Sequence, residues 1–211
     1  AGIVFKPLAL VSIYGSYSVS YLPSAGDQFS SLTTITQQVK PEKFENYELG
    51  IKWDLRRDLS LTTAVYRLDR TNTRATDPND PTRIIQTGSQ RTNGYEVGLT
   101  GGITRKWRVS GGYAYQDAFI ANSTTVAPAG ARVAQTPRHS SSLWTSLRVT
   151  NRLIGGLGVV RRGEVFAAID NTVKLPAYTK FDGAVAFVIS ENVRFRANIE
   201  NLLGVHYFAN A

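Results

Sequence analysis

The sequence predicts an all-β protein: an antiparallel transmembrane β-barrel, of which this chain forms an incomplete nine-strand portion. Three observations predict this fold. Apolar residues recur with a period of 2 in long runs, tight and long connections alternate along the chain, and one face of the runs carries no charge. No window contains the roughly 20 consecutive apolar residues that a membrane-spanning helix needs.

Nine alternating runs are the predicted strands. Each is rich in Val, Ile, Leu, Thr, Tyr and Phe, and many exceed the roughly 5–6 residues common in soluble proteins. In chain order the runs cover residues 8–21, 44–53, 59–70, 84–100, 106–119, 138–149, 153–166, 177–189 and 193–208.

The connections between the runs alternate in length. The tight ones are Asp54–Asp58, Gly101–Arg105, Thr150–Arg152 and Ser190–Asn192, and the long ones cover about 22–43, 71–83, 120–137 and 167–176. Antiparallel strands joined in this way place every tight turn at one end and every loop at the other. Outer-membrane barrels have this layout, with short periplasmic turns and longer extracellular loops.

The odd-numbered face of the runs is apolar through the middle of every strand. Representative members are Ile13, Leu49, Val97, Leu143, Leu157, Val185 and Phe195. The even-numbered face carries charged residues that we expect to pair across neighbouring strands or to contact a plug: Glu48, Lys52, Glu96, Arg108, Lys180, Asp182, Arg194 and Arg196. An Arg or Lys facing lipid near the bilayer midplane costs about 2–4 kcal/mol, so a lipid-facing surface excludes such residues.

A half-buried sheet of a soluble protein also alternates and is the competing interpretation. The positions of the aromatic residues favour the membrane. Trp53 and Trp107 lie beside tight turns, whereas Tyr17, Tyr47, Tyr95 and Tyr113 lie towards the loops. Two aromatic girdles of this kind mark the two water interfaces of a membrane barrel.

Four segments carry a resemblance to a known family. They are Pro41–Gly50 (PEKFENYELG), Gly88–Gly98 (GSQRTNGYEVG), Leu175–Phe187 (LPAYTKFDGAVAF) and Asn198–Phe208 (NIENLLGVHYF). In this order and spacing the chain resembles the C-terminal part of the barrel of TonB-dependent outer-membrane siderophore receptors. The segment Asp69 to Arg74, together with Asp77 to Pro81, most resembles the catecholate receptors of that family.

The resemblance implies a 22-stranded barrel in the bacterial outer membrane, of which residues 1–211 would form the C-terminal part, strands 13 to 21. It also implies a plug domain, a segment that engages TonB and a final strand, none of which we find in this sequence. The implied function is energy-driven import of a ferric siderophore. Outer-membrane lipid and lipopolysaccharide are the expected surroundings, and iron is expected only within the siderophore and not as a resident cofactor.

A large, aromatic, anionic ferric chelate is best bound by arginine, which is always charged, donates from a planar fork and stacks on rings. Arg91, Arg138 and Arg162 lie near the loop ends of strands and are the predicted ligand-binding residues. The alternative for any loop arginine is a contact with lipopolysaccharide phosphates or with solvent.

Other functions have less support. The chain has no Cys and only two His residues, which argues against Cys-ligated and His-rich metal sites. We expect no enzyme, because the neighbours His139 and Ser140 point to opposite faces of a strand. The net charge of +8 is scattered over loops, so we expect no nucleic-acid partner. A passive porin remains the alternative transport function.

Overall fold

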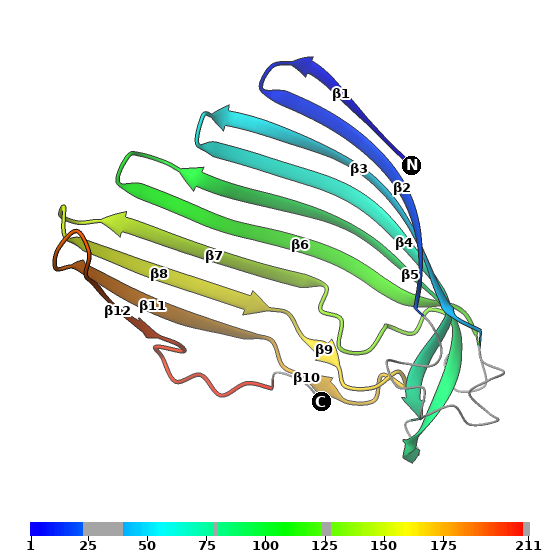
Figure 1. Cartoon of the computed structure of the whole chain (residues 1–211). Helices are drawn as coiled ribbons and strands as arrows, with labels where there is room; N and C mark the ends of the chain where they lie inside the picture. The colour runs from blue at the N-terminus through cyan, green and yellow to red at the C-terminus, as the bar shows by residue number, and fades with distance from the viewer. Residues whose placement is uncertain (23–39, 78–79, 124–127, 209–211) are drawn as a thin grey trace.

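The computed structural model describes residues 1–22, 40–77, 80–123 and 128–208. They form a ten-stranded antiparallel sheet in the order β1-β2-β3-β4-β5-β6-β7-β8-β11-β12 (Figure 1). Its strands are β1 (Gly2–Leu8), β2 (Val11–Leu22), β3 (Glu42–Arg56), β4 (Leu59–Asp77), β5 (Asp80–Gly102), β6 (Trp107–Asn122), β7 (His139–Arg148), β8 (Leu153–Arg162), β11 (Tyr178–Val188) and β12 (Arg194–Ile199). The short strands β9 (Val165–Phe166) and β10 (Lys174–Leu175) pair with each other in the connection between β8 and β11.

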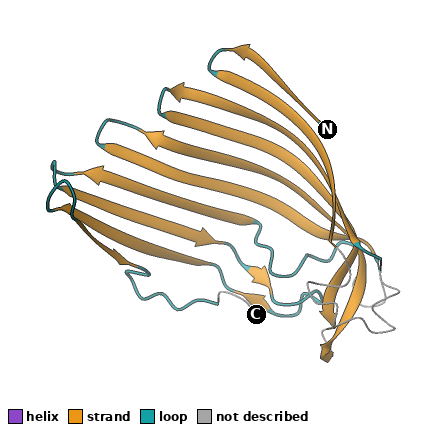
Figure 2. Ribbon diagram, viewed as in Figure 1, coloured by secondary structure: helices purple, strands orange, loops and turns teal. Residues whose placement is uncertain are grey.

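Strands and their connections make up everything drawn for the described residues in Figure 2, and none of these residues belongs to a helix that could cross a bilayer. The turns that join β1 to β2, β3 to β4, β5 to β6, β7 to β8 and β11 to β12 lie at one end of the sheet, on the left in Figure 1, and the longer connections from β6 to β7 and from β8 to β11 start and end at the other end. The expected alternation is therefore confirmed for these connections, whereas most of the predicted loop over 22–43 lies outside the described residues.

The register keeps the two faces of the sheet separate across all ten strands. Except at irregularities near the strand ends, odd-numbered residues pair with odd-numbered residues, as in Ile13 with Ile51, Val65 with Tyr95, and Phe187 with Phe195. A shift of one residue at any interface would move a strand's apolar set to the other face. The odd-numbered apolar side chains consequently form one continuous surface.

That surface is not a buried core. Leu49, Val97 and Phe195 are 57%, 38% and 58% exposed. The buried apolar cluster among the described residues is small: Ile120 and Ile169, with Ala131 and Ala134 packed against them near the loops. The apolar face is thus available to contact hydrocarbon, and a half-buried soluble sheet does not describe this chain.

The expected count of nine strands is wrong, because the structure has an additional strand, β1, before the first predicted run. β1 turns into β2 through Ala9 and Leu10. Neither residue is a usual turn former, so no turn signal in the sequence separates β1 from β2. Pro7 further weakened the strand signal, and Pro is tolerated at a sheet edge such as this one.

The last predicted run, 193–208, is also too long. β12 ends at Ile199, and Asn201 (φ 53°) and Gly204 (φ 60°) adopt the left-handed conformation that a strand excludes. The Asn201 side chain holds this turn by accepting a hydrogen bond from the Val205 N–H at 2.9 Å and donating to the Val205 carbonyl at 3.0 Å.

The long connection expected over 71–83 is mostly paired strand. β4 and β5 continue as a two-stranded ribbon until Asp77 faces Asp80. The pairing is irregular near Asn72, whose φ is 59°. The polar residues that suggested a loop instead occupy a ribbon that extends beyond its neighbours (Figure 1).

Candidate functional site at the loop end of the sheet

Aromatic side chains mark a boundary on the odd-numbered face at the loop end. The ring centroids of Tyr17 and Tyr47 are 4.9 Å apart, and those of Tyr95 and Tyr115 are 5.3 Å apart. The Tyr113 hydroxyl lies 2.8 Å from Nδ1 of His139. At the turn end, Trp53 and Trp107 are exposed on the same face. The two predicted girdles are therefore present.

Beyond the loop-end girdle the odd-numbered face becomes charged. Asp69 accepts hydrogen bonds from Nε of Arg67 at 2.9 Å and from Nε of Arg91 at 2.6 Å. The charge-free part of this face is thus confined to the zone between the girdles. Arg91, predicted to bind ligand, lies on the same face as the lipid-facing residues and is bound to a carboxylate.

Arg138 lies immediately before β7. Its guanidinium donates to the Asp117 carboxylate at 3.1 Å, and Arg132 lies 3.7 Å from the same oxygen. Asp117 has odd parity in β6, so Arg138 also turns towards the odd-numbered side.

Arg162 is the predicted residue that belongs to the polar, even-numbered face. It ends β8 and lies in register between Ser140 of β7 and Tyr178 of β11. Its Nη2 donates to the Gln135 carbonyl at 2.8 Å, which connects it to the loop before β7.

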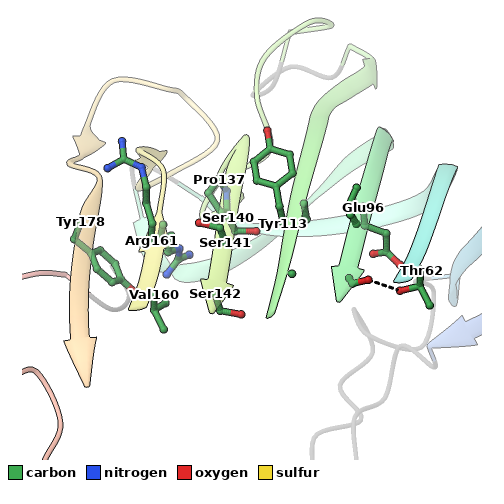
Figure 3. A pocket seen from close by; sticks show the side chains of 15 residues that line it. Thr62, Glu96, Tyr113, Pro137, Ser140, Ser141, Ser142, Val160, Arg161 and Tyr178 are labelled. Carbon is green, nitrogen blue, oxygen red and sulfur yellow. Dashed lines mark hydrogen bonds between the residues drawn. The ribbon is translucent and has the colours of Figure 1, made fainter. Parts of the chain in front are cut away.

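Arg162 and Tyr178 line a cavity of about 510 Å³ that spans β4 to β11. The cavity exists because small residues occupy the even-numbered positions of its central strands: Gly98, Gly112, Ala114, Ser140 and Ser142. Glu96 and Thr62 line its far side, where the Thr62 hydroxyl donates to the Gly98 carbonyl at 3.4 Å (Figure 3). We call this the inner-face cavity.

A stacked aromatic pair adjoins the inner-face cavity. The rings of Tyr178 and Tyr207 have centroids 4.3 Å apart and are inclined by 24°. Neither residue was among the predicted ligand contacts. The pairing of β8 with β11 could have been used to place Tyr178 next to Arg162. The position of Tyr207 could not be predicted, because it follows the turn at Asn201 and Gly204, which lies within a run that the sequence pattern predicted to be a single strand.

In the ranges that the structure describes, one ion pair on the inner face crosses between strands, Arg70 of β4 with Glu42 of β3, but the charged residues predicted to do so pair only within their own strands. Lys180 and Asp182 are 3.3 Å apart on one strand, and Lys52 and Asp54 are 3.8 Å apart on another. Residues i and i+2 share a face and lie about 6–7 Å apart, so long side chains can meet. Within the described part of the chain, Glu48 and Glu96 have no cationic partner.

A second cavity, of about 690 Å³, lies where the loops meet β7 and β8. Tyr113, His139 and Arg161 line it from the odd-numbered face. Arg132, Arg138, Lys174 and Glu164 approach it from the loops. We call this the basic pocket.

The electrostatics of the basic pocket reflect an excess of cations. Nζ of Lys174 donates to Glu164 at 2.8 Å, and this hydrogen bond lowers the pKa of the Glu164 carboxyl. Partial burial, reinforced by the nearby Arg138, lowers the pKa of Arg132. The four cations outnumber the two carboxylates, Glu164 and Asp117, by two.

A protein-family comparison matches residues 1–202 to the family described as TonB dependent receptor-like, beta-barrel. The probable TonB-dependent siderophore receptor PiuA of Acinetobacter baumannii is 34% identical over 100% of this chain and 30% of its own length. The catecholate siderophore receptor Fiu of Escherichia coli K12 is 32% identical over 100% of this chain and 29% of its own length. The chain thus spans about 30% of the length of these curated relatives.

Solved structures show the same architecture. The crystal structure of PiuA superimposes with a TM-score of 0.82 at 32% identity, covering 98% of this chain and 32% of PiuA. The closed form of the ferric-catecholate import receptor Fiu gives a TM-score of 0.81 at 29% identity, covering 99% of this chain and 31% of Fiu.

Proposed function

Because this chain belongs to the TonB-dependent receptor β-barrel family, we propose that it forms part of a receptor that imports a ferric siderophore with energy supplied through TonB. The family is one of the outer membrane, so the sheet described above lies in that membrane. The observation that carries the proposal is the similarity of the entire chain to siderophore receptors at about one-third identity.

The proposed ligand is a ferric catecholate. This class is supported by the similarity to Fiu, a catecholate siderophore receptor, and by the chemistry of the inner-face cavity. Catecholate complexes are aromatic and anionic, and the cavity is lined by Arg162 and by its register partner Tyr178, whose ring stacks on Tyr207. A guanidinium binds the anionic oxygens, and tyrosine rings stack on the catechol rings.

Arg162 is the strongest candidate of the three predicted ligand contacts. It has even parity and lines the inner-face cavity, whereas Arg91 and Arg138 are bound to Asp69 and Asp117 on the other side of the sheet. The proposed partners are TonB and a plug domain elsewhere in the receptor, together with outer-membrane lipid. Iron is cargo within the siderophore.

The test is uptake of a radiolabelled ferric catecholate by cells that carry the full-length gene. We expect Arg162→Gln to weaken binding roughly tenfold or more, because a hydrogen bond to a charged group contributes about 1.5–3 kcal/mol. Arg148→Gln, at the turn end of β7, is the matched control and should retain wild-type uptake. Absence of uptake by the wild type for every ferric catecholate tried would refute the proposed ligand class.

A further inference from the structure

The side chain of Asn171 joins two long connections at the loop end of the sheet. Asn171 lies between β9 and β10, in the connection from β8 to β11. Its Oδ1 accepts a hydrogen bond from the Arg132 N–H at 2.7 Å, and its Nδ2 donates to the Arg132 carbonyl at 3.0 Å. Arg132 lies 39 residues earlier, in the connection from β6 to β7. The amide satisfies both backbone groups of Arg132, as a neighbouring strand would do.

The backbone around Asn171 is shaped to make this contact. Asn171 has a φ of 57°, in the left-handed region that asparagine adopts more readily than most residues. Its Nδ2 also donates to the Ala168 and Ile169 carbonyls at 3.3 Å each, which closes the turn in which Asn171 lies. The same turn buries Ile169 against Ile120 of β6. Hydrogen bonds and apolar packing therefore hold the two connections together at one place.

The joined connections also hold Arg162. Gln135 lies three residues after Arg132, and its N–H donates to the Phe166 carbonyl at 2.8 Å. The Gln135 carbonyl accepts the hydrogen bond from Nη2 of Arg162 at 2.8 Å. Both backbone groups of Gln135 thus bind the end of β8 and the residues that follow it. A guanidinium carries its N–H donors in a fixed fork, so a bond to one of them also sets the direction of the others.

We propose that Asn171 is a positioning residue for siderophore binding: by fixing the backbone at Arg132 it places Gln135, which orients the Arg162 guanidinium at the inner-face cavity before the ligand arrives. The inference rests on the proposed role of Arg162 in ligand binding. Asn171, itself a described residue, lines neither the inner-face cavity nor the basic pocket, so it acts through Arg162. Ordering a loop during binding costs affinity, and a loop that is already ordered avoids this cost.

The test is titration of purified full-length receptor with a ferric catecholate. Asn171→Gly removes the amide but keeps a residue that adopts positive φ. We expect the affinity to fall roughly threefold to tenfold, the range for one hydrogen bond, and the maximum uptake rate in cells to stay unchanged. Asn72→Gly is the matched control, because Asn72 has a φ of 59° and donates to the Pro41 carbonyl at 2.9 Å, whereas Arg162 ends β8. This control should bind the siderophore as the wild type does.

A double variant shows whether the effect of Asn171 passes through Arg162. In a receptor that carries Arg162→Gln, the further change Asn171→Gly should lower the affinity no more, because residues that act as one unit are not additive. An equal additional loss in both backgrounds would mean that Asn171 acts elsewhere and would overturn the proposal. Wild-type affinity of Asn171→Gly, beside weak binding by Arg162→Gln, would also overturn it and would leave the proposed function intact.

Hydrogen exchange of the same full-length proteins tests the proposal without a ligand. Peptides that cover residues 128–137 should exchange faster in Asn171→Gly than in the wild type or in Asn72→Gly, because the Arg132 and Gln135 amides lose protection. Unchanged exchange would overturn the proposal, whatever the receptor binds. Faster exchange in the variant of a receptor whose wild type binds no ferric catecholate would refute the proposed ligand class and support the link from Asn171 to Arg162.

Discussion

At the scale of single residues, the aromatic side chains of Tyr14, Tyr66 and Trp144 lie against glycines of the neighbouring strand on the inner face, Tyr14 against Gly50. Trp144 covers Gly156 and Gly158, and a Cβ added at Gly158 would lie 2.6 Å from its ring. Tyr66 covers Gly94 in the same way, with the corresponding distance at 2.5 Å. Because glycine has no side chain, these aromatic side chains can pack against the neighbouring strand instead of projecting into the lumen. The glycines therefore keep space open inside the barrel.

This arrangement predicts that Gly158→Val impairs assembly. The added side chain must displace Trp144, and overpacking of this kind typically costs about 1–3 kcal/mol. Gly155→Val is the matched control, because a Cβ at Gly155 meets nothing within 4 Å. The measurement is the fraction of full-length receptor that is heat-modifiable in gel electrophoresis of outer membranes. Equal fractions for the two variants would contradict the steric role of Gly158.

Arg91 was predicted to bind ligand, but in the structure its side chain is paired with Asp69. Because Asp69 holds its guanidinium at 2.6 Å on the odd-numbered face, we expect Arg91→Gln to reduce siderophore affinity less than Arg162→Gln. Arg67 also binds Asp69, so part of the network remains in the Arg91 variant. Titration of the purified receptor with a ferric catecholate measures both affinities. A larger loss for Arg91→Gln would make Arg91 the main ligand contact.

At the scale of strands, a charged residue introduced between the two aromatic girdles should impair assembly on the odd-numbered face but not on the even-numbered face. Leu49→Arg introduces a cation into the lipid-facing zone at a cost of about 2–4 kcal/mol. Ser16→Arg places the same side chain at an adjacent level on the inner face, where Ser16 faces Glu48 in the register. We expect reduced assembly for Leu49→Arg and near-normal assembly for Ser16→Arg, measured by heat-modifiability. Similar defects in both would argue against the assignment of faces.

The strands show how far sequence can predict this fold. The alternation of apolar and polar residues identified both faces and nearly every long strand. The signal is strong because charged residues are unfavourable at every lipid-facing position, and these positions are the odd-numbered residues of many successive strands. It failed at Ala9 and Leu10, where a turn lacks turn-forming residues, and at Asn201, where one left-handed residue ends the strand. The partners of Arg91, Arg138 and Arg162 could not be predicted, because they depend on registers set across loops.

At the scale of the whole molecule, the described sheet has two edges, β1 and β12. Backbone N–H and C=O groups along an edge cannot remain unpaired in hydrocarbon. We therefore expect residues 1–211 expressed alone to form no heat-modifiable species in the outer membrane, whereas the full-length receptor does. Detection of a folded, membrane-inserted monomer of the isolated segment would show that its edges can be satisfied without the rest of a barrel.

The uncompensated acids of the inner face give a second prediction at this scale. Glu48 accepts hydrogen bonds from the Tyr14 hydroxyl at 2.6 Å and from Asn46 at 3.4 Å, but in the described residues neither Glu48 nor Glu96 meets a cation. Carboxylates enclosed in a barrel are stabilised by opposite charge. A cation from a plug is the available source in a complete receptor, so these two acids should help to hold the plug in place.

The double variant Glu48→Gln/Glu96→Gln removes both charges while keeping side-chain size and much of the hydrogen bonding. We expect the plug to be held less firmly, so cells carrying the full-length variant should become more sensitive to a large antibiotic that the intact outer membrane excludes. Glu45→Gln is the matched control, since Glu45 lies on the opposite face and is paired with Lys43 at 3.0 Å. Because loss of assembly would also change permeability, receptor abundance is measured in the same membranes. Unchanged sensitivity at equal abundance would mean that these acids act only within the wall of the barrel, through contacts such as the one with Tyr14.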